Sequence, residues 1–92
     1  MKNLIFNQTG IFHLKRMAFR AQAKYQQRFA LSDEAGIIAL IRFAESVRDI
    51  EMKRNFMLFY INSPDEVKAY LLKTYNIASP VERFNIGKIN SA

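Results

Sequence analysis

Apolar residues recur at helical spacing through the first third of the chain. Six of them, three or four positions apart, share one face of a helix: Ile11, Leu14, Ala18, Ala21, Tyr25 and Phe29. The pattern predicts a helix over residues 11–29. The preceding residues 7–10 (Asn-Gln-Thr-Gly) are typical of a turn, and we expect Thr9 to cap the helix.

The same segment carries a second, narrower apolar strip made of Phe12, Phe19 and Ala23. Aromatic side chains at helical spacing belong to a core more often than to an interface, so we expect Phe12 and Phe19 to be buried. Two strips would allow this helix to contact two neighbouring elements, or one neighbour and a partner.

A second helical pattern begins after Ser32, which we expect to accept hydrogen bonds from the first free backbone N–H groups. Its apolar residues again repeat every three or four positions: Ile37, Leu40, Ile41, Ala44 and Val47, with Phe43 and Ile50 widening the stripe. The opposite face should be solvated, because its charges can pair along the helix: Arg42 with Glu45, Glu45 with Arg48, and Asp49 with Lys53.

The segment from Phe56 to Ile61 is apolar on every side. We interpret it as a buried continuation of the second helix, because Ile61 is its only β-branched residue. A central strand is the alternative, since periodicity does not separate a short buried strand from a buried helical segment.

Residues 63–66 (Ser-Pro-Asp-Glu) form the clearest local signal. The serine can cap a helix, the proline suits its first turn, and the glutamate can bond back to the cap. We expect this helix to run to about Tyr75 and to end at Asn76 in the left-handed conformation. A similar pattern predicts a helical turn near residues 80–85.

Together these patterns predict an all-α fold, a small bundle of three to four helices. The alternative is an α+β fold with short strands near residues 2–6 and 56–61. No internal repeat or linker divides the chain, so we expect one helical domain over residues 1–92, with a short N-terminal arm (1–8) and a C-terminal tail (86–92).

Residues that carry chemistry are sparse. The chain has no cysteine, which excludes disulfides and thiolate metal sites. His13 is its single histidine, and the acid pairs at 33–34 and 65–66 stand where helix capping explains them. The three glycines are scattered and form no phosphate-binding loop. We therefore expect a protein that is not an enzyme and that holds no metal or cofactor.

Signals for export or membrane insertion are also weak. The N-terminal apolar run is too short for a signal peptide. The longest strongly apolar run, residues 56–61, is far below the ~18 residues of a membrane span. A soluble, cytoplasmic protein is the expectation.

Positive charge is concentrated near the N-terminus. The net charge is +6; residues 1–32 contain six Lys and Arg and no acid, whereas residues 33–92 contain eight bases and eight acids. Four of these cations recur every four residues and form a row along the first predicted helix: Arg16, Arg20, Lys24 and Arg28. No acid on that helix can pair with them. Such a row is compensated either by water and the acids of the second helix, or by a negatively charged partner.

We predict that this basic face binds a partner. The candidate binding residues are His13, Lys15, Arg16, Arg20, Lys24, Gln27 and Arg28. An acidic protein surface or a nucleoprotein complex would meet these side chains, with Phe12, Phe19, Tyr25 or Met17 as apolar anchors.

A nucleic acid is the alternative partner. The same cations would contact phosphates, and Gln22, Gln26 or Gln27 could contact bases. The chain shows no helix-turn-helix spacing, zinc finger or aromatic stacking platform that would favour this alternative. Binding to a membrane surface ranks last, because the second apolar strip dilutes the amphipathic character of the helix. A homodimer stays open.

In general character the chain is similar to small accessory proteins of phages and mobile elements, being short, helical and free of cysteine, with one charged face. That resemblance implies a non-catalytic regulator or inhibitor that acts on a host protein or nucleoprotein.

Overall fold

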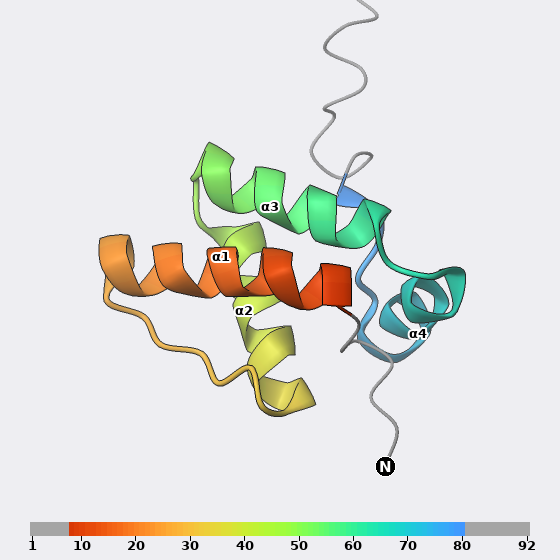
Figure 1. Ribbon diagram of the computed structural model, residues 1–92. Coiled ribbons are helices and arrows are strands. Elements are labelled where there is room, and N and C mark those ends of the chain that lie inside the picture. The colour runs from red at the N-terminus through yellow and green to blue at the C-terminus, as the bar shows by residue number, and fades with distance from the viewer. Residues whose placement is uncertain (1–7, 81–92) are drawn as a thin grey trace, which may run out of the picture.

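The computed structural model describes residues 8–80, and their regular structure is entirely helical. The helices are α1 (Gln8–Tyr25), α2 (Glu34–Ser46), α3 (Ile50–Ile61) and α4 (Asp65–Tyr75) (Figure 1). The predicted all-α bundle is confirmed. The alternative strand at residues 56–61 is wrong, because this segment forms the second half of α3. The other alternative strand, near residues 2–6, and the tail at 86–92 lie outside the described residues.

Helix α1 ends four residues before the predicted end at Phe29. Gln26 adopts a left-handed conformation with φ 55°, and the Gln27 amide bonds back to the Ala21 carbonyl at 3.0 Å. This geometry closes a helix, and residues 26–33 then form a loop. The predicted continuation is wrong because an ordinary glutamine occupies the left-handed position that glycine or asparagine more often takes.

The first two helices also begin differently from the prediction. Thr9 lies inside α1 and not at its cap. Helix α2 is capped by Asp33, whose side chain accepts from the Gly36 amide at 2.8 Å, in place of the expected Ser32. A glycine is needed there, because a Cβ on Gly36 would lie 1.7 Å from the carbonyl oxygen of Ala30. The loop therefore rests directly on the start of α2.

A break at residues 47–49 separates α2 from α3, where the pattern predicts one continuous helix. Asp49 is only 4 % exposed, and its Oδ1 accepts from two amides of the first turn of α3 at 3.0 and 3.1 Å. Lys53 donates from its Nζ to carbonyls that end α2, including that of Val47 at 2.8 Å. The expectation that Asp49 and Lys53 lie on a solvated face is wrong, because both side chains close the turn between the helices.

Helix α4 begins and ends close to the predicted residues. The predicted cap is wrong: the Ser63 hydroxyl donates to the Phe59 carbonyl at 2.7 Å, and the N-cap position of α4 is Pro64, which makes no side-chain cap hydrogen bond. The predicted end is confirmed, since Asn76 is left-handed with φ 58° and ψ 35°. Of the helical turn expected near residues 80–85, Pro80 is helical and the rest lies outside the described residues.

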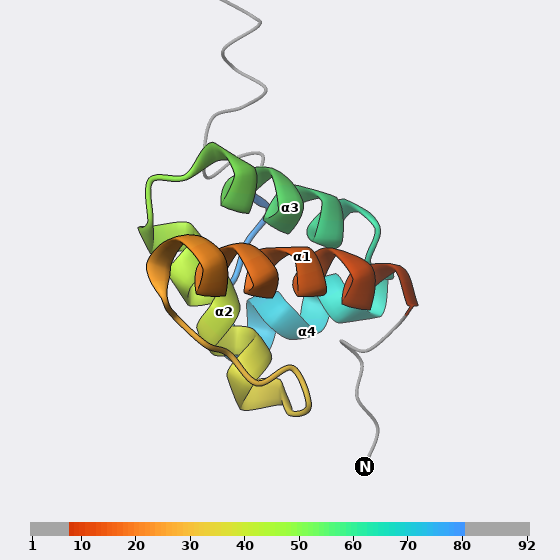
Figure 2. The ribbon, with the colours of Figure 1, turned by 60° about the vertical axis from the view of Figure 1, so that its left-hand side comes forward.

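Helices α1 and α3 lie side by side and run in opposite directions in both views (Figures 1 and 2). Helix α2 packs against both of them. The shared core includes the predicted apolar positions of α2, which are buried: Ile37, Leu40, Ile41 and Ala44. The expectation that Ile50 widens the apolar stripe of this helix is wrong, because its side chain is 70 % exposed. Over residues 8–80, no helix has the length and apolar character that crossing a membrane requires.

Side-chain hydrogen bonds attach helix α4 to α2, and one carboxylate of α2 accepts two of them. The hydroxyls of Tyr70 and Tyr75 both donate to Glu34 at the start of α2. These bonds raise the pKa of both tyrosines, so the hydroxyls stay protonated. Arg42 adds a hydrogen bond to the Tyr75 carbonyl at 2.8 Å. Leu71 of this helix is fully buried in the core.

Candidate functional site

The seven predicted binding residues do not form one ridge. Five of them lie on α1: His13, Lys15, Arg16, Arg20 and Lys24. Gln27 and Arg28 lie in the loop after the helix, because α1 ends at Tyr25. The predicted row is therefore interrupted before Arg28, and only its α1 part has helical spacing.

His13 is half-buried and does not add a charge to this face. Its Nδ1 is enclosed and has no hydrogen-bond partner within the described part of the chain. Burial lowers the pKa of His13, and the nearby charge of Arg16 lowers it further. The imidazole is therefore neutral at neutral pH.

Asp49 neutralises part of the basic row. The Arg20 Nε donates to both carboxylate oxygens at 2.9 and 3.1 Å, the Lys24 Nζ lies 3.3 Å away, and the Tyr25 hydroxyl donates at 2.5 Å. Burial alone would raise the pKa of Asp49, but these bonds and the Met52 amide outweigh it and hold the pKa well below its usual range. Of the two kinds of compensation expected for this row, that by acids of the second predicted helix therefore holds for Arg20 and Lys24.

Sequence reasoning missed this contact because Asp49 is 29 residues from Arg20 in the chain. The available signal was local: aspartate is a preferred N-cap, and Asp49 precedes an apolar run with Glu51 in its first turn. That signal locates the start of α3 but says nothing about which cations will meet it. Only the antiparallel packing of α1 on α3 brings them together.

The face nevertheless stays basic. Two cations share the single charge of Asp49, and Arg20 reaches it through Nε, which leaves its two terminal Nη groups for another anion. Lys15, Arg16 and Arg28 are exposed, and within residues 8–80 no carboxylate forms an ion pair with them. The Arg16 guanidinium instead lies 5.8 Å from the centre of the Phe12 ring.

The expectation that Phe12 and Phe19 are core residues is wrong. Phe12 is 56 % exposed and Phe19 is 75 % exposed. Helix α1 buries the face that carries Leu14, Met17 and Ala21, and no element within residues 8–80 covers the opposite strip. Met17 is therefore no partner anchor, and the Tyr25 hydroxyl is held by Asp49. Of the four proposed anchors, the two phenylalanines remain.

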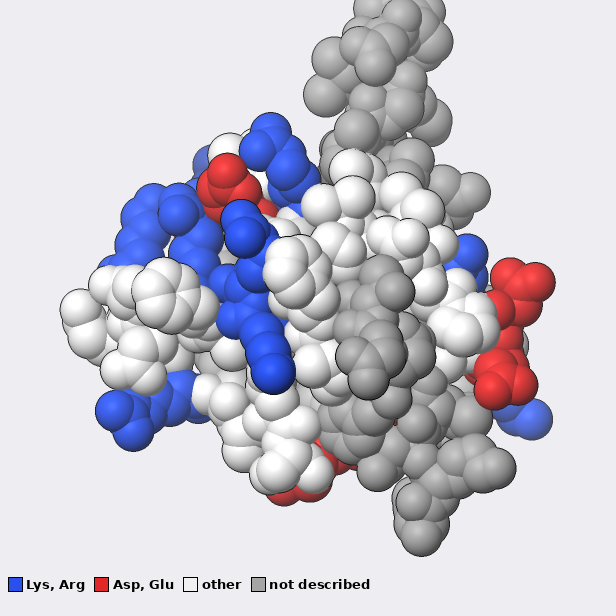
Figure 3. Space-filling view, in the orientation of Figure 1, with Lys and Arg blue, Asp and Glu red and all other residues white. Residues whose placement is uncertain are grey.

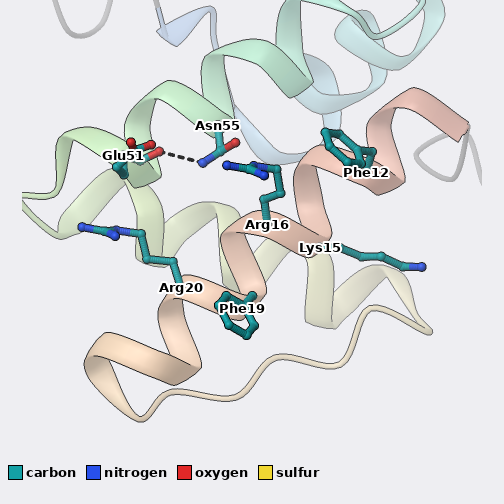
Figure 4. A pocket seen from close by; sticks show the side chains of 7 residues that line it. All are labelled: Phe12, Lys15, Arg16, Phe19, Arg20, Glu51 and Asn55. Carbon is teal, nitrogen blue, oxygen red and sulfur yellow. Dashed lines mark hydrogen bonds between the residues drawn. The ribbon is translucent and has the colours of Figure 1, made fainter.

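A groove of about 570 Å³ runs between α1 and α3 beside these rings (Figure 4). The α1 side chains that line it will be called the aromatic–basic face: Phe12, Lys15, Arg16, Phe19 and Arg20. Helix α3 contributes Glu51 and Asn55. Asn55 is only 6 % exposed and donates to the Glu51 carbonyl at 3.0 Å, while the Glu51 carboxylate pairs with Arg54 at 3.3 Å.

A second hollow, of about 710 Å³, lies on the other side of Phe19. Its walls are α1 and the loop that follows: Lys15, Ala18, Phe19, Gln22, Arg28, Phe29, Ala30 and Leu31. Phe19 and Lys15 line both hollows. Phe19 therefore lies between the two depressions, and its side chain is exposed.

The two ends of the molecule differ in charge. Figure 3 shows Lys and Arg side chains gathered at the end formed by α1 and the start of α3. At the opposite end, over α4, acidic and basic side chains lie together, because α4 holds Asp65 and Glu66 as well as Lys68 and Lys73. An approaching anion is therefore attracted to the α1 end.

Among the residues that the structure describes, no group of three or more potential ligand side chains could hold a metal ion. The arrangement presents cations that suit a negatively charged surface, together with exposed aromatic rings and two hollows that suit apolar contacts. In comparisons with protein-family models, curated proteins and solved structures, the chain matches none.

Proposed function

We propose that this protein is a non-catalytic regulator that binds an acidic surface of a partner protein through the aromatic–basic face of α1. Phe12 and Phe19 insert into apolar depressions of the partner, while Lys15, Arg16 and Arg20 meet its carboxylates. Occupation of that surface blocks or redirects the partner. The protein needs no reaction of its own for this role.

The observation that carries the proposal is the exposure of Phe12 and Phe19 on a helix whose other face is fully packed. Burying a large aromatic side chain is worth ~2 kcal/mol, so two exposed rings on a small domain forgo considerable stability. Aromatic and arginine side chains are the residues that dominate binding energy at protein interfaces. Phe12 and Phe19 combined with Arg16 and Arg20 match that composition.

The spacing of the rings also suits a protein partner. Phe12 and Phe19 are seven residues apart on α1, which is two helical turns or about 10.5 Å along the axis. Side chains at positions i and i+7 are the usual anchors of a helix that docks with another helix or groove. Stacked bases of a single strand would need platforms that lie closer together.

A nucleic acid is the second candidate, and one observation favours it: Lys15, Arg16 and Arg28 have no acidic partner in the described part of the chain. Phosphates could take these positions. Two features of the groove weigh against it. One side of the Phe12 ring is occupied by Arg16, and the carboxylate of Glu51 would repel a continuous chain of phosphates.

Site-specific photo-cross-linking in the native host tests the proposal. A photoreactive phenylalanine analogue in place of Phe12 should cross-link one acidic protein. The matched control carries the analogue in place of Leu72, which is 52 % exposed but lies on α4. That control should not capture the same protein.

The captured protein is then purified and its affinity measured by calorimetry. Exchanging Lys15 and Arg16 together for Glu should weaken binding at least about thirty-fold, the range of an interface hot spot. Equal capture from both positions, nuclease-sensitive capture from Phe12, or unchanged affinity of the folded double variant would each refute the proposal.

A further inference from the structure

We infer that the groove between α1 and α3 receives an acidic amphipathic α-helix of the partner protein. The inference rests on the proposed function and adds the kind of segment that is recognised. It concerns the groove lined by the aromatic–basic face together with Glu51 and Asn55 (Figure 4).

The shape of the groove fits a helix. Its walls are two antiparallel helices, and the lining residues of each recur every four positions: Phe12, Arg16 and Arg20 on α1, with Glu51 and Asn55 on α3. Such rows form ridges with a furrow between them, into which the side-chain ridge of a third helix packs. An occupant with apolar residues at i and i+7 would contact Phe12 and Phe19 together.

The charge of the groove selects an acidic occupant. Lys15 and Arg16 have no acidic partner within residues 8–80, and Arg20 contacts Asp49 through its Nε. The single acid of the lining, Glu51, is already paired with Arg54 at 3.3 Å. The lining therefore has a positive excess that carboxylates of the partner would compensate.

Arg20 is well prepared for this contact. The buried Asp49 holds its guanidinium through two hydrogen bonds, at 2.9 and 3.1 Å, before any partner arrives. Less side-chain entropy is then lost on binding, because the long side chain is already ordered. Asp49 is thus a positioning residue for the binding face as well as the cap of α3.

The position of Glu51 favours a helix over a nucleic acid as the occupant of the groove. A nucleic-acid strand carries a phosphate at every nucleotide and would have to place one near Glu51. An amphipathic helix can place an apolar residue there and its carboxylates near Lys15 and Arg16. The described lining therefore favours the helix.

The neighbouring hollow supplies matched controls. Gln22 and Arg28 line only that hollow, whereas Phe12 and Asn55 line only the groove. A change in Arg28 alters the basic charge near Phe19 without touching the groove. The response to Phe12→Ala and Arg28→Gln therefore tells which depression the occupant uses.

The test selects binders of the full-length chain from a displayed library of random peptides of about 16 residues, long enough for four helical turns. The enriched sequences should carry apolar residues at i, i+3 or i+4, and i+7, with Asp and Glu on the flanks. The best peptide, labelled with a fluorophore, is then titrated with each variant, and circular dichroism checks that each variant keeps its helices.

We expect Phe12→Ala to lower the affinity for this peptide at least about ten-fold and Arg28→Gln to change that affinity less than about two-fold. Glu51→Gln should tighten binding about two- to three-fold at low salt, because a repelling charge is removed. A merely structural role of Glu51 would not produce a gain. A random 20-mer of single-stranded DNA should bind more weakly than the peptide.

Enriched peptides without helical periodicity or acidic residues, no enrichment at all, or tighter binding of the DNA would overturn the inference. So would a loss caused by Arg28→Gln but not by Phe12→Ala. These failures are separable from failure of the proposed function. If the cross-linked protein still depends on Lys15 and Arg16 while Phe12→Ala is neutral, the partner binds the aromatic–basic face without placing a helix in the groove.

Discussion

The two halves of α1 use the same residue types for opposite purposes. In its C-terminal half, three side chains converge on one buried carboxylate, that of Asp49: Arg20, Lys24 and Tyr25. In its N-terminal half, Lys15 and Arg16 stand beside two exposed rings, and no acid of residues 8–80 pairs with them.

The difference shows that a regular row of cations need not have one role. The residues that lie opposite the break between α2 and α3 are used to hold α1 against α3, because Asp49 is desolvated there and requires positive partners. Lys15 and Arg16, about one turn before Arg20, line the groove with Asn55 and Glu51. Glu51 is paired with Arg54 at the surface, so no buried acid of the groove lining needs these two cations as counter-ions. Arg20 stands at the boundary and contributes to both.

Removing Asp49 should have the largest effect on stability. Asp49→Ala deletes the cap of α3 and leaves the ammonium and guanidinium groups around it without a counter-ion, so we expect a loss of about 3 kcal/mol in the free energy of unfolding. Urea denaturation measures it. Glu51→Ala is the control, because that acid makes only a surface pair with Arg54 and should change stability by less than about 0.5 kcal/mol. Similar losses for both variants would contradict a special role for Asp49.

Lowering the pH should weaken the contacts that the C-terminal half of α1 makes with Asp49. The pKa of Asp49 is held below its usual value in the folded protein, so the unfolded chain takes up this proton first as the pH falls. The stabilisation is complete above the ordinary aspartate pKa of about 4 and decreases below it. Between pH 6 and pH 3, the wild-type protein should lose about 1 kcal/mol more than Asp49→Asn. Parallel curves of stability against pH would contradict the prediction.

The smallest expected effect is a difference in thermal stability between variants of Arg16 and Arg20. Arg20→Gln should lower the midpoint of thermal unfolding, because it removes both hydrogen bonds to Asp49. Arg16→Gln, one turn away, should leave the midpoint unchanged, because the Arg16 guanidinium lies over the exposed Phe12 ring and forms no ion pair with an acid of residues 8–80. For the affinity for the proposed partner we expect a different order: Arg16→Gln should weaken binding at least as much as Arg20→Gln. Equal unfolding midpoints for the two variants would remove the distinction between the halves.

Local patterns predicted the elements well where each residue responds to its own neighbours. The stripe of Ile37, Leu40, Ile41 and Ala44 is buried, because a face with apolar residues at every turn must be covered wherever the helix lies. Asn76 ends α4 as expected, since asparagine tolerates the left-handed conformation. Gln26 escaped prediction because glutamine has no such preference, so its conformation follows from the path of the loop.

The candidate site was only partly readable from the chain. The basic residues and the two phenylalanines could be named as binding candidates, but their surroundings could not. Burial of Asp49 beneath Arg20, and exposure of Phe12 and Phe19, both depend on which face of α1 meets α3. The first partly neutralised two cations that remain at the surface, and the second supplied the anchors that we propose.

The sequence alone therefore determined the all-α fold, the apolar faces of the helices and the concentration of positive charge near the N-terminus. These follow from the spacing of residues along the chain, which is a local property. Only the tertiary structure decided which cations are neutralised, where α1 stops and which aromatic strip stays uncovered. Those outcomes depend on contacts between residues far apart in sequence, such as Arg20 with Asp49, whose pairing no local pattern records.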